Sequence, residues 1–240
     1  MNAKKPIKTQ WKPTDNRFVC FLDILGFKDM VMRSSHEEIY ELLNRISADR
    51  NKLSTVIDKG LTENPKFDAD IYTVSFSDSI VIFSKNDDLV NFKLFIASVN
   101  WLFARAIIND IPLKGAVAHG QISLNKTNQI YFGQPIIDAY LLEEEVNYFG
   151  VVAHNSIDKY MIVNNFDDKD NYFFESETPL KSGLITHTNL NWFSKLLKKD
   201  GDDSTSNDSV IERIVKFKKS TSGSPRKYID NTVKIYSKIK

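Results

Sequence analysis

The chain has 240 residues, a length that at about 150 residues per domain allows one large domain or one domain with an appendage. Its 32 basic and 31 acidic residues leave a net charge of +1, which argues against a broad nucleic-acid-binding surface. The 42% of hydrophobic residues can bury a core. Cys20 is the single cysteine, and the chain opens without a leader-like segment, so we expect a reducing, cytoplasmic location.

The first sixty residues predict an arm, a strand and a helix. Residues 1–16 are polar and basic with two prolines, which predicts a mobile arm. Residues 18–25 form a nearly continuous apolar run that ends at Gly26, a pattern typical of a strand buried on both faces. A capping-box pattern at residues 35–38 then opens a helix whose apolar spacing holds to Gly60.

The middle of the chain predicts a hairpin, a long helix and a strand. Short strands at 70–76 and 79–84 flank Ser77 and Asp78, a spacing that predicts a tight turn. Residues 89–108 are apolar at the 3.6-residue period and contain polar side chains that would be costly in a bilayer. We therefore expect a core helix there and no membrane span, followed by a strand at 113–122.

A further helix and strand complete the predicted sheet. Pro135 is favourable in the first turn of a helix, and residues 151–154 predict a strand. The order β-α-β-β-α-β, then α-β, predicts an α+β, ferredoxin-like (split βαβ) domain over residues 17–165, with its helices on one face.

Residues 166–240 predict a C-terminal elaboration that packs on this domain. Its expected elements are strands near 172–175 and 183–193, a polar loop at 201–208, and helices at about 208–219 and 225–238.

Two aspartates are the strongest chemical candidates. Asp23 interrupts an apolar strand, where a lone carboxylate is costly to bury. Asp78 at a hairpin tip would by itself be ordinary turn chemistry, but in a split-βαβ sheet the two positions meet at one edge. Such a pair suits Mg²⁺ or Mn²⁺ with substrate phosphates. The turn Leu25-Gly26-Phe27 before a helix offers backbone N–H groups to a polyphosphate.

Four segments, in order and at matching intervals, resemble the class III nucleotidyl cyclases. They are FLDILGF (21–27), FSDSIVIF (76–83), GAVAHGQISL (115–124) and IYFGQPIIDAYLLEEE (130–145). The resemblance covers about residues 17–165. It implies an enzyme that cyclises a nucleoside triphosphate and acts as a homodimer with sites shared across the interface.

The resemblance also implies roles for individual residues. Asp23, Asp78 and the carbonyl of Ile24 would hold two Mn²⁺ or Mg²⁺ ions per site, and Leu25, Gly26 and Phe27 would bind the nucleotide. Lys114 stands where the family tends to place a basic residue, so it is a candidate catalytic contact to phosphate, with a solvated strand-end lysine as the alternative. The glutamates of the run 143–145 are expected to face water from a helix.

Departures from the family pattern bear on the substrate. The positions of the base-reading Lys and Asp of purine cyclases hold Val74 and Ile130, and those of the transition-state Asn and Arg hold Ile137 and Leu141. These side chains donate no hydrogen bond. Either catalysis is lost or the pocket is rewired. Tyr72, on the same strand face as Val74 by the period of two, is a candidate base contact.

Further segments resemble the pyrimidine cyclases of the bacterial Pycsar anti-phage systems. They are the hairpin S-D-S-I, the run A-Y-x-L-E (139–143), P-L-K-S-G (179–183) and Asn191-Trp192. This resemblance implies conversion of UTP to cyclic UMP and pyrophosphate, which activates a separate effector. The alternatives are CTP and cyclic CMP, a catalytically silent nucleotide-sensing module, and another palm-like enzyme such as a diguanylate synthase.

Overall fold

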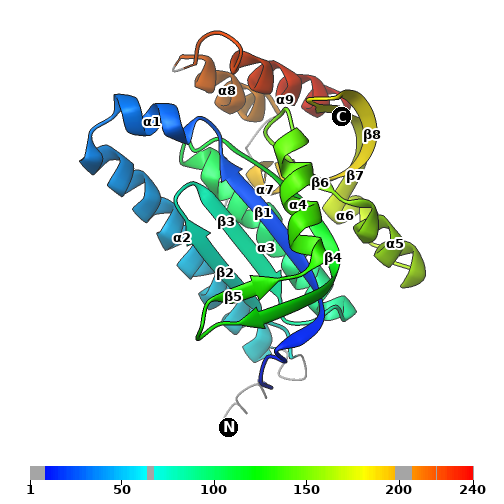
Figure 1. Cartoon of the computed structure of the whole chain (residues 1–240). Coiled ribbons are helices and arrows are strands. Elements are labelled where there is room, and N and C mark those ends of the chain that lie inside the picture. The colour runs from blue at the N-terminus through cyan, green and yellow to red at the C-terminus, as the bar shows by residue number, and fades with distance from the viewer. Residues whose placement is uncertain (1–8, 64–67, 198–206, 220, 240) are drawn as a thin grey trace.

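The computed structural model describes residues 9–63, 68–197, 207–219 and 221–239. Its centre is one eight-stranded sheet with the strand order β2-β3-β1-β4-β6-β8-β7, and β5 pairs with β4 (Figure 1). The strands are β1 Thr14–Ile24, β2 Ile71–Phe76, β3 Ser79–Ser84, β4 Leu113–Asn125, β5 Ile130–Phe132, β6 Val151–Ala153, β7 Phe173–Leu180 and β8 Gly183–Leu190.

The α-helices are α1 Phe27–Arg33, α2 His36–Glu63, α3 Leu89–Ile108, α4 Gln134–Glu145, α5 Asn155–Val163, α6 Lys169–Tyr172, α7 Phe193–Leu197, α8 Asn207–Lys216 and α9 Arg226–Lys238. A short 3-10 turn, Phe217–Lys219, follows α8. The predicted capping box opens α2, because the N–H of Ser35 donates to the Glu38 carboxylate at 2.8 Å and the Glu38 N–H donates to Ser35 Oγ at 3.2 Å.

Helices cover both faces of the central strands, so the expectation of helices on one face is wrong. Phe18, Cys20 and Leu22 of β1 belong to the large core beneath α2 and α3. Val19 and Phe21 alternate toward the opposite face, where they join the smaller cluster beneath α4. Figure 1 shows α4 crossing in front of β1 and β4 while α3 lies behind. The reason is in β1 itself, because a strand that is apolar on both sides needs a cover on both sides.

Helix α3 is the main element of the large core. Within the described residues it is the one helix whose length and hydropathy would allow it to cross a membrane, and two thirds of its most apolar window is buried inside the protein. Phe92, Phe95, Val99 and Phe103 have no more than a trace of exposed surface. The helix is therefore apolar because it is buried in the core of the protein.

The N-terminal segment joins the fold earlier than expected. Strand β1 begins at Thr14, inside the predicted mobile arm, and pairs there with Ser123 of β4. The indole N–H of Trp11 donates to the carboxylate of Asp70 at 3.0 Å. Residues 11–16 are therefore held by the sheet, while residues 1–8 lie outside the described residues. Strand β5, which the sequence placed in the segment leading to the helix, forms because it pairs antiparallel with the end of β4.

The C-terminal elaboration extends the same sheet. Strands β7 and β8 form a hairpin, and β8 lies beside β6 with Val152 opposite Asn189. Helices α8 and α9 lie together above the end of the sheet where β1 finishes (Figure 1). Most of the predicted polar loop at 201–208 lies outside the described residues. This arrangement brings the last part of the chain next to the edge that carries Asp23.

Candidate active site

The β2–β3 hairpin brings Asp78 to the end of β1. Asp23 is opposite Ser79 in the β1–β3 register, and the N–H of Ile24 donates to the carbonyl of Asp78 at 3.0 Å. Ser77 takes a left-handed conformation with φ 56°, which lets the chain reverse in two residues. Two carboxylate-bearing residues that are 55 positions apart in sequence are therefore neighbours at the same end of the central strands.

Asp23 is in an electrostatically unfavourable position. Its side chain is half-buried on the α4 face of β1. Burial is the main cause that raises its pKa from 3.8 to about 7, with further contributions from the charges of Glu143 and Asp78, while Lys114 opposes the shift. Because ionised Asp23 lacks sufficient positive charge around it, a divalent cation between the two aspartates would offset the repulsion. The donor set fits an Mg²⁺- or Mn²⁺-type ion, which takes one or two carboxylates plus substrate oxygens.

Lys114 and Glu143 form a buried ion pair beside Asp23. Lys114 Nζ lies 2.8 Å from Glu143 Oε1 and donates to the Glu143 carbonyl at 2.9 Å. Both side chains are less than a tenth exposed, so Lys114 is not a solvated strand-end lysine. The expectation that Glu143 faces water is wrong, because α4 packs directly on the strands and turns this residue inward.

The other two glutamates of the run also have partners. The hydroxyl of Tyr140 donates to Glu144 Oε1 at 3.1 Å, and the backbone N–H of Ser182 donates to Glu145 Oε2 at 3.2 Å. The expectation of a purely solvated run is therefore wrong for Glu145 as well, because the β7–β8 turn packs against the end of α4. The sequence carries no periodic signal for this contact, since the turn follows almost 40 residues later.

The turn after β1 is open, although one of its expected donors is already used. The N–H of Leu25 donates to the carbonyl of Pro112 at 2.9 Å, so this group is not available to a phosphate. Gly26 has a φ of 74°, and a side chain there would meet no atom within 4 Å. Phe27 begins α1 immediately afterwards.

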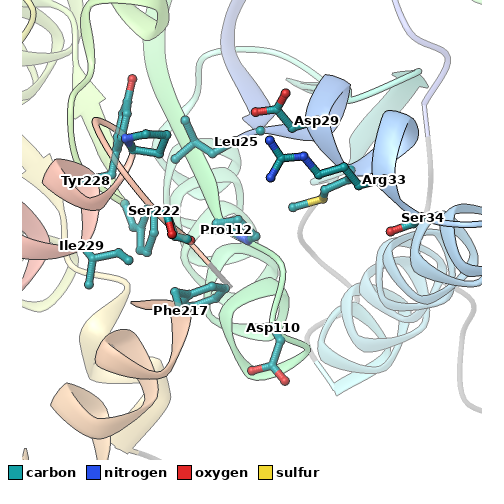
Figure 2. A pocket seen from close by; sticks show the side chains of 15 residues that line it. Leu25, Asp29, Arg33, Ser34, Asp110, Pro112, Phe217, Ser222, Tyr228 and Ile229 are labelled. Carbon is teal, nitrogen blue, oxygen red and sulfur yellow. The ribbon is translucent and has the colours of Figure 1, made fainter. Parts of the chain in front are cut away.

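A cavity of about 550 Å³ opens beside this turn. Leu25, Gly26 and Pro112 line one part of it. Figure 2 shows Phe217 and Tyr228 on the side of the C-terminal region, with Asp29 and Arg33 of α1, Ser34 and Asp110 also around the space. The sequence did not indicate this cavity, because its walls come from both ends of the chain.

Tyr72 lies elsewhere on the same face. Tyr72 is opposite Phe83, and Phe83 is opposite Val19 of β1. Val19 lies four residues before Asp23, which is about 13 Å along the strand at about 3.3 Å per residue. Its hydroxyl shares a 3.0 Å hydrogen bond with that of Tyr131. The structure thus places Tyr72 with Val74 as expected, but well away from the two aspartates.

Exposed apolar side chains lie on the α4 side of the sheet, from the β2–β3 hairpin near Asp78 to β5 at the opposite end of β1. Phe76, at the hairpin, is 83% exposed. The other members lie on β5 and on the outer side of α4, and each is about half exposed or more: Ile130, Phe132, Ile137 and Leu141. We call these five residues the apolar face. Exposed apolar residues gathered on one side of a protein are typical of interaction surfaces.

Within the described residues, no group of three or more His, Cys, Asp or Glu side chains is arranged to hold a metal by itself. A cation at Asp23 and Asp78 would therefore need further ligands from the backbone, water or substrate. This arrangement differs from a closed structural metal site and resembles one completed by phosphates.

Comparison with known proteins identifies the architecture. No protein-family model matches the sequence, and no curated protein matches it at a significant level. Solved structures do match. One is the monomeric guanylyl cyclase domain of the RhoGC fusion protein from the aquatic fungus Blastocladiella emersonii, with 12% identity, a TM-score of 0.53, and coverage of 76% of this chain and 98% of that domain. The chain has the nucleotidyl cyclase fold.

A second match has the same character. It is the catalytic core of a rhodopsin-guanylyl cyclase with converted specificity in complex with ATPαS, with 13% identity, a TM-score of 0.54, and coverage of 76% of this chain and 98% of that one. The α+β fold predicted from the sequence is thus confirmed, because its sheet matches those of solved cyclase domains.

Proposed function

We propose that the chain is a nucleotidyl cyclase that converts a nucleoside triphosphate to a cyclic nucleotide and pyrophosphate. The observation that carries the proposal is the juxtaposition of Asp23 and Asp78 beside the Gly26 turn, on a cyclase fold. The two carboxylates and the Ile24 carbonyl would hold Mn²⁺ or Mg²⁺. Bound there, the cations would acidify the ribose 3′-hydroxyl and neutralise the leaving pyrophosphate.

The residues around Asp23 position it for this task. Asp23 is held in register between β3 and β4, opposite Ser79 on one side and Lys114 on the other. The buried Lys114–Glu143 pair anchors α4 to β4, and its two charges act in opposite directions on Asp23. We therefore assign Lys114 a positioning role instead of a direct contact to phosphate. Preorganised charge of this kind is a main source of enzymatic rate enhancement.

The proposed substrate is a pyrimidine nucleotide, with UTP preferred over CTP. Val74 is half-buried in the cluster beneath α4, and Ile130 is half exposed on β5. Neither residue supplies the charge or amide that reads a purine edge, which supports a smaller base. The further proposal, a cytoplasmic second-messenger role with a separate effector in anti-phage defence, rests on the Pycsar-like segments of the sequence.

The apolar face supports a homodimer. Its residues extend along the α4 face from the β2–β3 hairpin to β5, and Ile137 and Leu141 on α4 are 51% and 54% exposed. A two-fold dimer would cover this surface and enclose a triphosphate between two chains. Ile137→Glu should shift the protein to monomer in analytical ultracentrifugation and reduce turnover. Val163→Glu, at a more exposed apolar position on α5 (75%), is the control; identical behaviour of the two variants would contradict the dimer.

One experiment tests the reaction and its substrate together. The protein is incubated with Mn²⁺ and all four ribonucleoside triphosphates, and the products are identified by chromatography. We expect cyclic UMP as the main product, and none with Asp78→Asn. A dominant cyclic AMP or cyclic GMP peak would overturn the pyrimidine proposal. Triphosphate binding without pyrophosphate release above that of Asp78→Asn would favour the silent sensing module.

A further inference from the structure

The β7–β8 turn is fixed against the end of α4, where Glu143 bonds to Lys114, the residue opposite Asp23. Val146, directly after α4, pairs with Leu180, and the N–H of Asn147 donates to the Pro179 carbonyl at 3.0 Å. The N–H of Lys181 donates to the Glu145 carbonyl at 2.7 Å. The backbone of Lys181 therefore has a defined position, although its side chain is exposed.

Helix α9 brings a second polar group to the same place. Tyr228 is half-buried and forms part of the wall of the cavity beside Leu25 and Gly26 (Figure 2). Burial is the main cause of its raised pKa; the charge of Lys181 lowers this pKa, and the charges of Glu143 and Asp23 raise it. Lys181 likewise lowers the pKa of Glu143. The geometry agrees with these directions: the Asn147 carbonyl accepts a 2.7 Å hydrogen bond from Asn231 of α9, and the Asn147 N–H donates to Pro179, so α9 and the β7–β8 turn meet at the end of α4.

The site otherwise has few groups that can hold a polyphosphate. The ammonium of Lys114 is bonded to Glu143, and the N–H of Leu25 is bonded to Pro112. Ile137 and Leu141 of α4 are apolar. Lys181 forms no ion pair with any residue that the structure describes, so its charge is available to a ligand.

We propose that Lys181 and Tyr228, both from the C-terminal elaboration, bind phosphate oxygens of the nucleotide at the edge marked by Asp23. The inference rests on the proposed nucleotide site and adds residues to it that lie outside the cyclase-like segments. An ammonium suits a phosphate as a point charge, and a tyrosine hydroxyl donates one hydrogen bond. The C-terminal region would then bind the substrate in addition to stabilising the sheet.

The probe is inorganic tripolyphosphate with Mg²⁺, measured by isothermal titration calorimetry on the full chain. Lys181→Met should weaken binding about 10-fold and Tyr228→Phe about 5-fold, in line with the loss of a hydrogen bond to a charged group. Lys181→Arg should retain most of the affinity. Lys159→Met, which removes an exposed charge on α5, is the control and should bind like the unmodified chain. Thermal unfolding checks that every variant is folded.

Steady-state kinetics separate this proposal from the proposed function. We expect Lys181→Met to lower kcat/KM with the best nucleotide by a similar factor, with rescue by Lys181→Arg. If the unmodified chain cyclises nucleotides but Lys181→Met and Tyr228→Phe behave like Lys159→Met, this inference is overturned while the cyclase function stands. If the unmodified chain neither binds tripolyphosphate nor forms product, both are overturned.

Discussion

The two faces of the sheet differ in how completely they are covered. The face beneath α2 and α3 holds the large core, in which Phe92, Phe95 and Phe103 are fully buried. The face beneath α4 holds a cluster of six buried residues, bordered by half-buried aromatics and by the apolar face. Burial of apolar area is the main source of folding free energy, so the first face carries most of the stability.

Alternate residues of β1 therefore have separate roles, one set in the core and the other on the α4 face. In β1, Leu22 and Ile24 point into the large core, while Asp23 between them points to the α4 face. A strand alternates its side chains with a period of two, so a rigid core can hold a carboxylate in place on its other side. The less covered face thus bears the charged residues and the exposed apolar residues, and the covered face keeps the strands that carry them in position.

The largest effect should follow from removing one carboxylate of the pair. Asp78→Asn should lower cyclase turnover by a factor on the order of 10³, because the negative charge that would hold a cation and orient the phosphates is lost. Turnover is measured as pyrophosphate release with Mn²⁺. The fold should persist, since the backbone carbonyl of Asp78, which accepts from Ile24, is kept. Asp167→Asn, at an exposed position after α5, is the control, and equal loss in both variants would refute the assignment.

A substitution on the opposite face should change the stability of the fold and not the turnover. Phe95→Ala removes a fully buried ring from the large core and should lower the free energy of unfolding by about 3–5 kcal/mol in urea titration. Turnover per folded molecule should change little at a temperature where the variant remains folded. Ile137→Ala, at a half-exposed position on α4, should lower the free energy of unfolding by less than about 1 kcal/mol. A reversal of this order would remove the distinction between the faces.

The buried ion pair on the α4 face should give a somewhat smaller loss of stability than Phe95→Ala. Lys114→Met leaves the Glu143 carboxylate buried without its partner, which should destabilise the fold by about 3 kcal/mol. The double variant Lys114→Met and Glu143→Leu should recover much of that loss, because no unpaired charge then remains. Urea titration of the two variants measures the difference. A double variant that is less stable than the single one would show that the unpaired Glu143 carboxylate is not the cause of the loss.

The parts of the fold that the sequence predicted well are those determined by local signals. The hairpin turn at Ser77 and Asp78, the bounds of α3 and the capping box of α2 all agree with the structure. Each depends on residues within a few positions of one another. The meeting of Asp23 with Asp78 also followed, because the split-βαβ order determines which strand ends lie together.

The parts that the sequence did not predict depend on contacts between distant segments. Glu143 resembles a solvated helix residue until α4 packs on β4 and brings it to Lys114. Strand β5 is three residues long and exists because β4 extends far enough to pair with it. The cavity beside Gly26 needs Tyr228 from the last helix. None of these contacts leaves a periodic pattern in the chain.

The smallest effect concerns the pH dependence of the metal-free protein. The pKa of Asp23 is about 7 in the fold and about 4 in an unfolded chain. Between these values the folded state binds a proton that the unfolded state has released, so the contribution of Asp23 to the free energy of unfolding falls as pH rises from about 4 to about 7 and is constant above. Asp23→Asn removes this dependence, because an amide does not ionise.

In a chelating buffer, Asp23→Asn should therefore have nearly the same Tm as the unmodified chain at about pH 4 and a higher Tm at pH 8. The difference in Tm should be small because Asp23 is partly exposed to solvent, which screens the repulsion from Glu143 and Asp78. Adding Mn²⁺ at pH 8 should raise the Tm of the unmodified chain and leave the variant unchanged, since ligand binding to the folded state stabilises it. A variant that is less stable at pH 8 than the unmodified chain without metal would show that the Asp23 carboxylate is compensated within the fold, and that no cation is needed there.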